Sequence, residues 1–526
     1  MMRGSSSGRE AKGGGRPNNV ISISAMGHSS GGRPNGNGGM KAAGRSNGSA
    51  LPVSAPQRRP AVRKSLKAAA KARARRAVRR MPIDKVIKES QRWLKIIAKP
   101  ERLTQKQRKR VVRDTVRSFD TYFNSGFLSY RKSVTEADQI ASVEWTGQGT
   151  TIEDVLGNQY IDCLGGFGIY CAGIRHPKIV EAVRNQLAQM PLSSQELLDP
   201  LRGALAELVG EITPGDLQKS FFINNGTDAI EGAMKLARLY TQKSGFISTV
   251  RGFHGKSYGS LSLMGKAEYR VAFEPLLQDV YFVEFGNADE VEWQLKKARD
   301  VGLDIAAIVA EPIQGEAGVI VPPDDYWPRL RELCDEHDVL LIADEVQTGM
   351  GRTGALFGVN HWDVTPDIMC LGKAIGGGVM PLSAFVSTPE IWKVLEANPF
   401  IHSSTFGGNP LACAAGIAAI NVTLEEDLPG QAAEAGQHFM KGLDEIHTRH
   451  ADVVADVRGK GLLIGIEFND TKFGYAVAAG MFRRKVLMAG TLINAKTLRI
   501  EPALFISKEE IDEVLNRLDD TLEDLT

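Results

Sequence analysis

The sequence predicts an α/β protein built on a mostly parallel sheet with helices on both faces. Short apolar runs recur a dozen or more residues apart, and they are the predicted strands 219–223, 305–312, 339–345 and 367–372. Helical periodicity marks the predicted helices 101–120, 177–190, 199–211 and 227–242. Strands that alternate with helices in this way are typical of parallel sheets.

A second, smaller α+β domain is predicted at the C-terminal end. The stretches "GLLIGIEF" (461–468) and "LRIEPAL" (498–504) alternate more clearly, and a helical pattern follows at 508–525. Alternation with period two indicates strands with one face buried. We therefore expect four segments along the chain: a disordered basic extension over 1–84, a helical and strand segment over 85–160, a large domain over 161–415 and a small domain over 416–526.

Composition limits the class of protein. Of the 526 residues 43% are hydrophobic and 24% charged, which is ordinary for a globular protein. No apolar run reaches the ~18–20 residues that a membrane span needs. The five cysteines are scattered outside any metal-binding spacing. We therefore expect reduced core thiols, no metal site, no membrane contact and a cytoplasmic location.

Charge is divided unevenly along the chain. Residues 1–80 hold 18 Lys and Arg against one acidic residue, whereas the remainder holds 46 basic and 61 acidic residues. We expect residues 1–55 to be disordered and 56–80 to form a basic helix when bound to an acidic partner. A solvated tail is the favoured interpretation, and an anchor to nucleic acid or an anionic surface is the alternative. A mitochondrial transit peptide is disfavoured because the opening lacks an apolar face.

Residues that can carry chemistry follow three of the predicted strands. The strand 219–223 is followed by Asn224-Asn225-Gly226-Thr227 at the start of a helix, which presents backbone N–H groups to an anion. Asp344 ends one apolar strand and Lys373 ends the next. Ligands of open α/β sheets bind at the carboxyl ends of the strands. We therefore expect an anion cradle, a buried carboxylate and a buried lysine on one rim of the sheet.

Pyridoxal phosphate is the cofactor that needs these three groups together. A lysine amine forms a Schiff base with its aldehyde, and desolvation makes that amine more nucleophilic. A carboxylate pairs with the protonated ring nitrogen, which keeps the ring an electron sink. The start of a helix holds the phosphate.

Two nucleotide-binding motifs fit this sequence less well. The stretch "GMGRTG" (349–354) matches a dinucleotide fingerprint, but the residues after it are too rich in Gly, Pro, Asn and Asp for the required helix. A phosphate-binding P-loop is incomplete, because Val250 stands where its first glycine belongs and Ala374 follows Gly372-Lys373. A nicotinamide dehydrogenase, and a nucleic-acid-binding protein with an idle enzyme core, stay the alternatives from other classes.

Six ordered blocks carry a family resemblance. They are "FINNGTDAIEGAMKLAR", "GFHGKSYGSLS", "AEPIQGEAGVI", "LIADEVQTGMGRTG", "PDIMCLGKAIGGG" and "STFGGNPLACAA". Together they resemble the class III, pyridoxal-phosphate-dependent aminotransferases. The resemblance implies fold type I, with the cofactor in the large domain over 161–415 and a shared active site in a homodimer or higher homo-oligomer. It also implies an amine and a 2-oxo acid as substrates.

The resemblance assigns the cofactor contacts residue by residue. The implied set is Gly226, Thr227, Phe253, Asp344, Gln347, Lys373 and Thr405. Lys373 resembles the Schiff-base lysine, which is also the catalytic base, and Asp344 the partner of the ring nitrogen. Gln347 is expected at the ring hydroxyl and Phe253 against the ring face. Gly226 and Thr227 are expected at the phosphate, together with Thr405 from a second subunit.

Blocks outside the shared core resemble the putrescine aminotransferases of this family. They are "FNSGFLSYRKSV", "IDCLGGFGIY", "SQELLDPLR", "GGGVMPLSAF" and "VLMAGTLINAKTLRIEPAL". The implied reaction, a step in polyamine (putrescine) catabolism, moves a terminal amine from putrescine to 2-oxoglutarate. It gives 4-aminobutanal, which cyclises to 1-pyrroline, and glutamate. Cadaverine is a second implied donor, and ornithine, acetylornithine or 4-aminobutyrate are the alternatives.

Four residues are expected at the substrate. Arg499 matches the carboxylate-binding arginine of the family, because a guanidinium clamps a carboxylate with two hydrogen bonds. Glu316 matches the glutamate that pairs with that arginine when no α-carboxylate is present. Gln195 and Phe167 are expected in the diamine pocket, with plain packing as the alternative for both, and a surface position on a strand is the alternative for Arg499.

Overall fold

The computed structural model describes residues 81–130 and 141–525. The chain divides into two compact units, residues 1–90 and 91–526. Of the first unit the structure describes residues 81–90, which open helix α2 (Ile83–Ala98). The predicted disorder over 1–55 and the predicted basic helix over 56–80 lie outside the described residues. No helix in the described ranges has the length and apolarity to cross a bilayer.

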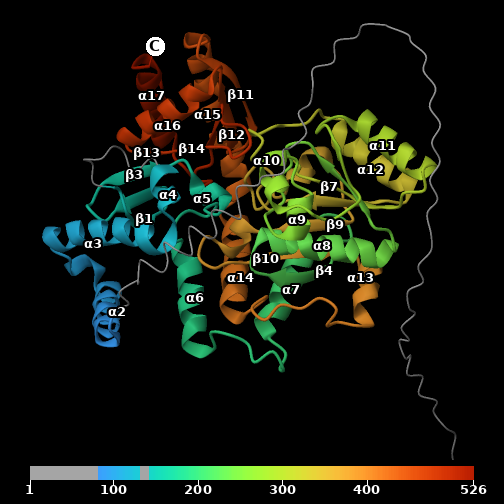
Figure 1. Ribbon diagram of the computed structural model, residues 1–526, viewed down its shortest axis with the longest axis horizontal. Coiled ribbons are helices and arrows are strands. Elements are labelled where there is room, and N and C mark those ends of the chain that lie inside the picture. The colour runs from blue at the N-terminus through green and yellow to red at the C-terminus, as the bar shows by residue number, and fades with distance from the viewer. Residues whose placement is uncertain (1–80, 131–140, 526) are drawn as a thin grey trace, which may run out of the picture. The chain divides into compact units, whose positions relative to one another are not determined.

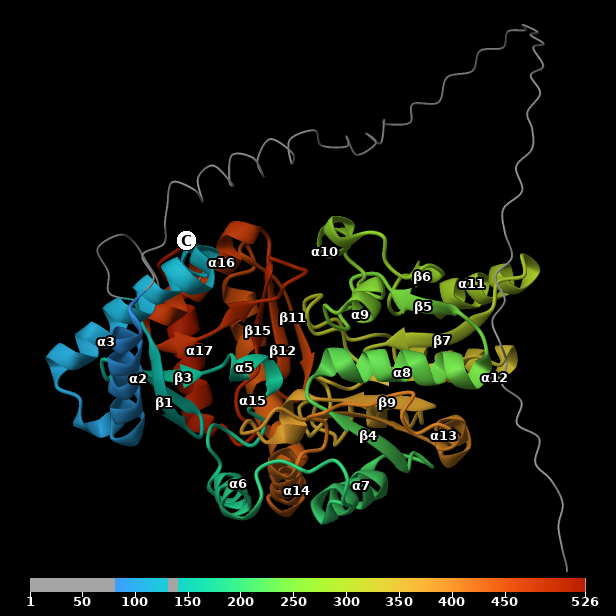
Figure 2. The ribbon, with the colours of Figure 1, turned by 60° about the horizontal axis from the view of Figure 1, so that its bottom comes forward.

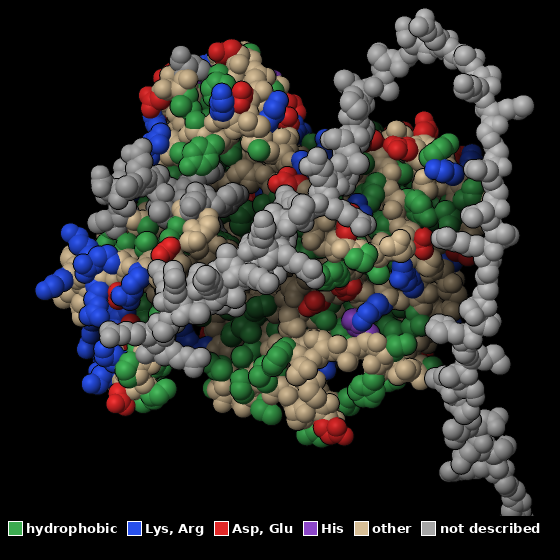
Figure 3. Space-filling model, viewed as in Figure 1, with side chains coloured by type: hydrophobic (Ala, Val, Ile, Leu, Met, Phe, Trp, Pro, Cys, Tyr) green, Lys and Arg blue, Asp and Glu red, His purple; other side chains and the backbone are tan. Residues whose placement is uncertain are grey.

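Helical segments precede the sheets. A short 3-10 helix, η1 (Pro100–Arg102), leads to α3 (Gln105–Ser118), which continues as a π-helix, η2 (Phe119–Asn124), and then as α4 (Ser125–Tyr130). Thr104 caps α3 and exchanges hydrogen bonds with Gln107, so the helix begins later than the pattern over 101–120 suggested. Figure 3 shows Lys and Arg side chains gathered over α3.

The large sheet has seven strands in the order β4-β10-β9-β8-β7-β5-β6. They are β4 (Lys219–Ile223), β5 (Gly245–Thr249), β6 (Val280–Val283), β7 (Ile305–Ala310), β8 (Leu340–Asp344), β9 (Ile368–Leu371) and β10 (Ser383–Ser387). Strand β10 is antiparallel to both β4 and β9, and the other described pairings are parallel. The prediction of a mostly parallel α/β sheet is confirmed, and β10 is the exception that the sequence pattern did not indicate.

A hydrophobic core covers each face of this sheet. Neighbouring residues alternate between the two cores, as Ile308 with Val309 and Leu341 with Ile342 do. Helices α8 (Gly226–Thr241) and α13 (Pro389–Glu396) supply one core. The other contains side chains of α7 (Pro200–Ile212), α11 (Ala288–Asp300), α12 (Tyr326–His337) and α14 (Pro410–Glu425). Figures 1 and 2 show these helices on the two sides of the strands. Burial on both faces explains why the strand sequences are apolar throughout.

Two smaller four-stranded sheets complete the fold. One has the order β1-β2-β3-β13, from β1 (Glu144–Gln148), β2 (Thr151–Asp154), β3 (Gln159–Asp162) and β13 (Val486–Leu487). The other is antiparallel, in the order β11-β12-β15-β14, from β11 (Val454–Lys460), β12 (Leu463–Phe468), β14 (Ala489–Gly490) and β15 (Thr497–Ile500). The α+β character predicted for the C-terminal part is confirmed.

The remaining helices lie around these sheets. They are α5 (Gly165–Gly168), α6 (Pro177–Gln189), α9 (Tyr258–Ser262), α10 (Ala267–Arg270), α15 (Leu428–Arg449), α16 (Thr471–Arg483), α17 (Lys508–Glu523) and the 3-10 helices η3 (Val271–Phe273), η4 (Gly358–Trp362) and η5 (Lys373–Gly376). The helices predicted over 177–190 and 508–525 are therefore confirmed to within two residues.

The "GMGRTG" stretch forms turns and opens no helix, as its composition predicted. Its Arg352 side chain is fully buried and donates hydrogen bonds to the carbonyl oxygens of Leu462 (3.0 Å) and Pro502 (2.7 Å). The Leu462 N–H in turn donates to the Arg352 carbonyl at 3.0 Å. This arginine therefore ties the loop after β8 to the loops that flank the C-terminal sheet.

We predict that Arg352→Met lowers the free energy of unfolding by about 3 kcal/mol, because it leaves two buried carbonyls without their charged donor. Urea unfolding followed by tryptophan fluorescence measures the change. Arg299→Met on α11 is the control, since that arginine is exposed and its loss is expected to change stability by less than about 0.5 kcal/mol. Equal midpoints for the two variants would contradict the structural role of Arg352.

Candidate active site

Lys373 lies directly after β9, where the strand passes into η5. Its backbone adopts a φ of 46°, in the left-handed region that a lysine rarely occupies. Burial lowers the pKa of the Lys373 amine, and the charges of Glu501, Glu316 and Asp344 oppose that shift without reversing it. A larger neutral fraction makes this amine a better nucleophile and base than an ordinary lysine.

Asp344 ends β8, the strand beside β9, and is buried. Its Oδ2 lies 2.8 Å from Nδ1 of His254, and its Oδ1 accepts a hydrogen bond from the Val346 N–H at 3.2 Å. Burial alone would lower the pKa of His254, but the hydrogen bond and charge of Asp344 raise it. The imidazole therefore fixes the orientation of the Asp344 carboxylate at the rim of the sheet.

The segment predicted to form an anion cradle is the start of α8. Asn225 caps the helix through its side chain, which accepts from the Asp228 N–H at 3.0 Å. The first N–H groups of a helix have no partner within it and can bind an anion. Thr227 Oγ1 lies 2.8 Å from Ser257 Oγ and 2.6 Å from Ser260 Oγ, so three hydroxyls gather at this end.

The cradle is contiguous with the lysine. A Cβ built on Gly372, the residue before Lys373, would lie 3.6 Å from the Cα of Gly226. A Cβ on Gly255 would lie 2.3 Å from Thr227 Oγ1, so only glycine lets this loop close on the hydroxyl cluster. The chain segments that carry the amine and the cradle therefore meet at one rim, as the sequence predicted.

Arg499 lies in β15 of the C-terminal sheet and is almost fully buried. Its Nη1 donates to Glu316 Oε1 at 3.0 Å, and its Nε lies 2.6 Å from Glu501 Oε2. Burial alone would lower the pKa of Arg499, but the two carboxylates raise it, so the guanidinium stays charged. The alternative of a surface strand residue is wrong for Arg499.

Phe167 is brought to the same guanidinium. The Arg499 guanidinium carbon lies 5.6 Å from the centre of the Phe167 ring, which is within reach of a cation–π contact. Phe167 is 37% exposed and adopts a φ of 63° within the "GGFG" turn of α5. The turn packs closely on the chain that carries Glu501, since a Cβ on Gly165 would lie 1.9 Å from the Glu501 carbonyl oxygen.

Gln347 and Phe253 also lie within this region. Gln347 Nε2 donates to Glu501 Oε1 at 2.6 Å. The Phe253 N–H donates to Glu311 Oε1 at 2.9 Å, and the half-buried Phe253 ring packs in a cluster with residues that include Met264. Buried carboxylates therefore hold the Gln347 side chain and the Phe253 backbone in place.

Gln195 and Thr405 lie together but apart from the lysine. Gln195 Nε2 donates to the Thr405 carbonyl oxygen at 2.6 Å, and both residues are exposed. Within the described part of the chain the Thr405 side chain makes no hydrogen bond, and no contact joins it to Thr227. One chain alone therefore does not place Thr405 at the anion cradle.

Sequence reasoning did not single out three buried groups of the site. Glu501 was missed although it follows Arg499 by two residues in "RIEP", a spacing that puts both side chains on one face of an extended segment. His254 was missed because its partner, Asp344, is distant in sequence. Glu311 was missed because the Phe253 N–H, which donates a hydrogen bond to it, is also distant in sequence.

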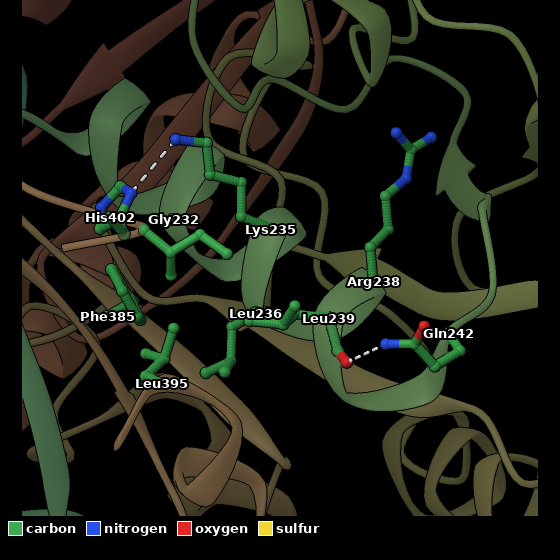
Figure 4. A pocket seen from close by; sticks show the side chains of 10 residues that line it. Gly232, Lys235, Leu236, Arg238, Leu239, Gln242, Phe385, Leu395 and His402 are labelled. Atoms are coloured by element: carbon green, nitrogen blue, oxygen red, sulfur yellow. Dashed lines mark hydrogen bonds between the residues drawn. The ribbon is translucent and has the colours of Figure 1, made fainter. Parts of the chain in front are cut away.

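A pocket outside this site lies along α8. It has a volume of about 390 Å³, and Figure 4 shows side chains that line it, with Lys235 Nζ 3.3 Å from His402 Nδ1. None of the residues predicted for the cofactor or substrate lines it. The residues that suggest the chemistry of Lys373 therefore lie at the rim of the sheet and not at this pocket.

The residues at the rim fit pyridoxal phosphate. The amine with a lowered pKa matches the aldehyde of the cofactor, and the fixed Asp344 carboxylate matches its cationic ring nitrogen. The Thr227 hydroxyl at the start of α8, with the adjacent hydroxyls of Ser257 and Ser260 from the start of α9, matches its phosphate.

Comparison with known proteins agrees with this fit. The family model described as "Aminotransferase class-III" matches residues 133–522. An ornithine aminotransferase from Toxoplasma gondii is 28% identical with a TM-score of 0.73, over 82% of this chain and 97% of that one. An amine transaminase from an uncultivated Pseudomonas species, solved in its PLP-bound form, is 30% identical with a TM-score of 0.69, over 74% and 97%. An acetylornithine aminotransferase from Elizabethkingia anophelis is 31% identical with a TM-score of 0.65, over 76% and 98%.

We predict a pH effect from Glu311, which accepts hydrogen bonds from the Phe253 and Gly315 N–H groups. Burial raises the pKa of Glu311 to about 7 from its usual 4.5. The folded state therefore holds this proton more tightly, and its contribution to stability is present below pH 4.5 and lost as the pH rises through about 7. Between pH 4.5 and about 7, the free energy of unfolding of the unchanged protein should therefore fall by up to about 3 kcal/mol more than that of Glu311→Gln.

Urea unfolding at a series of pH values between 4.5 and 7 measures this difference, and any constant offset from the new amide cancels in the slope. Glu332→Gln on the exposed side of α12 is the control and should keep the slope of the unchanged protein. An unchanged slope in Glu311→Gln would show that Glu311 does not take up a proton in this interval.

Proposed function

This chain belongs to the class-III aminotransferases, which depend on pyridoxal phosphate, and we propose that it moves the terminal amine of putrescine to 2-oxoglutarate. Cadaverine is proposed as a second donor. The products are 4-aminobutanal, which loses water to form 1-pyrroline, and glutamate. The observation that carries the proposal is the Arg499–Glu316 pair beside Lys373, with Nη1 and Oε1 3.0 Å apart.

The proposed cofactor site follows the geometry at the rim. Lys373 would be the covalent attachment point, and Asp344, oriented by His254, would pair with the ring nitrogen. Gln347 would lie at the ring hydroxyl and Phe253 against the ring. The phosphate is proposed to bind at Gly226 and Thr227, which open α8, and at the hydroxyls of Ser257 and Ser260, which lie beside Thr227 at the start of α9.

The bound cofactor supplies an aldehyde for the donor amine and a ring that withdraws electrons from the reacting carbon. The chain supplies the proton transfer. The Lys373 Nζ, neutral for a larger fraction of the time because burial lowers its pKa, takes a proton from the amine-bearing carbon of the donor and later returns one. The Lys373 backbone is held in a left-handed conformation, with a φ of 46°.

The substrate end must accept two different molecules in turn. With a diamine bound, Arg499 stays paired with Glu316 and needs no carboxylate from the substrate. With 2-oxoglutarate bound, the Arg499 guanidinium is the group that can clamp a carboxylate, and Glu316 must move aside. Phe167, 5.6 Å from the guanidinium, is proposed as a wall of the pocket.

We propose a homodimer in the cytosol. Thr405 is exposed and has no phosphate-site contact within its own chain, which accords with a role at the phosphate of a second subunit. Gln195, which donates to the Thr405 carbonyl, would then line the pocket of that neighbouring site. The five free, buried cysteines accord with a reducing compartment.

We predict that putrescine has a higher kcat/KM than ornithine, acetylornithine and 4-aminobutyrate, by about tenfold or more, because each of those donors brings a carboxylate that must displace Glu316 from Arg499. Glutamate formed from 2-oxoglutarate measures all four donors in one assay. A higher kcat/KM for ornithine, acetylornithine or 4-aminobutyrate would keep the aminotransferase chemistry and overturn the proposed donor.

A further inference from the structure

Arg499 is held between two carboxylates rather than one. Glu316 Oε1 accepts from its Nη1 at 3.0 Å, and Glu501 Oε2 lies 2.6 Å from its Nε. All three side chains are at least nine-tenths buried, with 2%, 8% and 1% of the side chain exposed for Arg499, Glu316 and Glu501. Because water and salt screen buried charges only weakly, the net charge of these three side chains affects which ligands the site can bind.

The Glu501 side chain lies close to the Lys373 side chain. A Cβ built on Gly168 would lie 3.4 Å from Glu501 Oε1, 3.6 Å from Lys373 Cδ and 3.6 Å from Gln347 Cγ. The Glu501 Oε1 also accepts the Gln347 amide at 2.6 Å. Its charge is the largest of those that oppose the effect of burial on the pKa of Lys373. Glu501 therefore acts on both the substrate arginine and the cofactor end of the site.

The charges of this cluster do not cancel. One guanidinium faces two carboxylates, so the cluster carries one negative charge in excess when the Lys373 amine is neutral. An uncompensated buried charge is costly, and a cationic ligand relieves that cost. A second ammonium at the far end of a donor is such a ligand.

We propose that Glu501 is a specificity-determining residue that selects donors with a cationic far end and no carboxylate. The inference rests on the proposed function, because it concerns which amine the same site accepts. A donor carboxylate must compete with two buried acidic groups for Arg499, whereas a diamine leaves both contacts in place. The negative excess attracts the free ammonium of the diamine and repels a carboxylate.

The same reasoning extends to the acceptor. A 2-oxo dicarboxylic acid also has to displace a carboxylate from Arg499 before the guanidinium can bind it. Glu501 therefore raises the KM of the acceptor while it favours the diamine. Removal of its charge should shift the donor and the acceptor in opposite directions, a pattern that a general loss of folding cannot produce.

The test compares the holoenzyme with Glu501→Gln. The rate at which each donor discharges the visible band of the bound cofactor is measured against donor concentration for putrescine and for 4-aminobutyrate. We expect the ratio of kcat/KM for putrescine to that for 4-aminobutyrate to fall by about tenfold or more. The KM for 2-oxoglutarate should fall. Glu467→Gln is the matched control, since that carboxylate pairs with Arg458 in the same C-terminal sheet at 2.7 Å but lies outside the site.

A binding measurement without turnover gives a second readout. Glutarate has two carboxylates and no reacting group, and its Kd for the holoenzyme is measured by calorimetry. We expect Glu501→Gln to bind glutarate about tenfold more tightly than the unchanged protein. Where Glu501→Gln does not fold, Glu501→Ala removes the same charge without a buried amide and must shift both measurements in the same directions.

The outcomes separate this inference from the proposed function. If the unchanged protein uses putrescine but both Glu501 variants keep its donor ratio and its glutarate Kd, the selection by Glu501 is wrong and the proposed function stands. If the unchanged protein transfers amine only from carboxylate-bearing donors, the proposed donor is wrong and the role of Glu501 is overturned with it. A lower ratio together with tighter glutarate binding supports the inference.

Discussion

Burial of the Lys373 amine beyond the carboxyl end of β9 determines which groups must surround it. A lysine in this position would destabilise the fold unless the neutral amine or nearby carboxylates relieved the cost. Both effects are present. Burial lowers the pKa of the Lys373 amine, and Asp344, Glu316 and Glu501 place negative charges around it. The parallel sheet supplies the location, since its strand ends bring β8 and β9 side by side.

The surrounding charges are arranged as fixed pairs rather than as a diffuse field. Asp344 is oriented by His254, and Arg499 is held by Glu316 and Glu501. The Asp344–His254 and Arg499–Glu316 pairs each join segments far apart in sequence, so the tertiary fold places them, whereas Glu501 follows Arg499 by two residues. The arginine sits on the C-terminal sheet and the lysine on the large one. The fold therefore brings the segment after β9 and the segment that ends β15 together, which sets the proposed substrate end beside the proposed cofactor end.

The strand ends could be predicted from the sequence, because each apolar run is followed by a polar or charged residue, as at Asp344 and Lys373. The antiparallel β10 could not, since strand direction depends on how the chain returns to the sheet. Glu501 could have been paired with Arg499 from its spacing, but its proximity to Gln347 and Lys373 could not be predicted, because those residues are distant in sequence. The site roles and the division near residue 415 stay predictions, as does the contribution of Thr405 from a second subunit.

The visible absorption spectrum of the purified protein loaded with pyridoxal phosphate shows whether Lys373 carries the cofactor and the chemistry. We predict a band that disappears when putrescine is added and returns with 2-oxoglutarate, and that is absent from Lys373→Ala treated in the same way. Lys393→Ala, an exposed lysine on α13, should keep the band and both responses. A band that survives in Lys373→Ala, or one that no amine donor discharges, would contradict the claim that this lysine carries the chemistry.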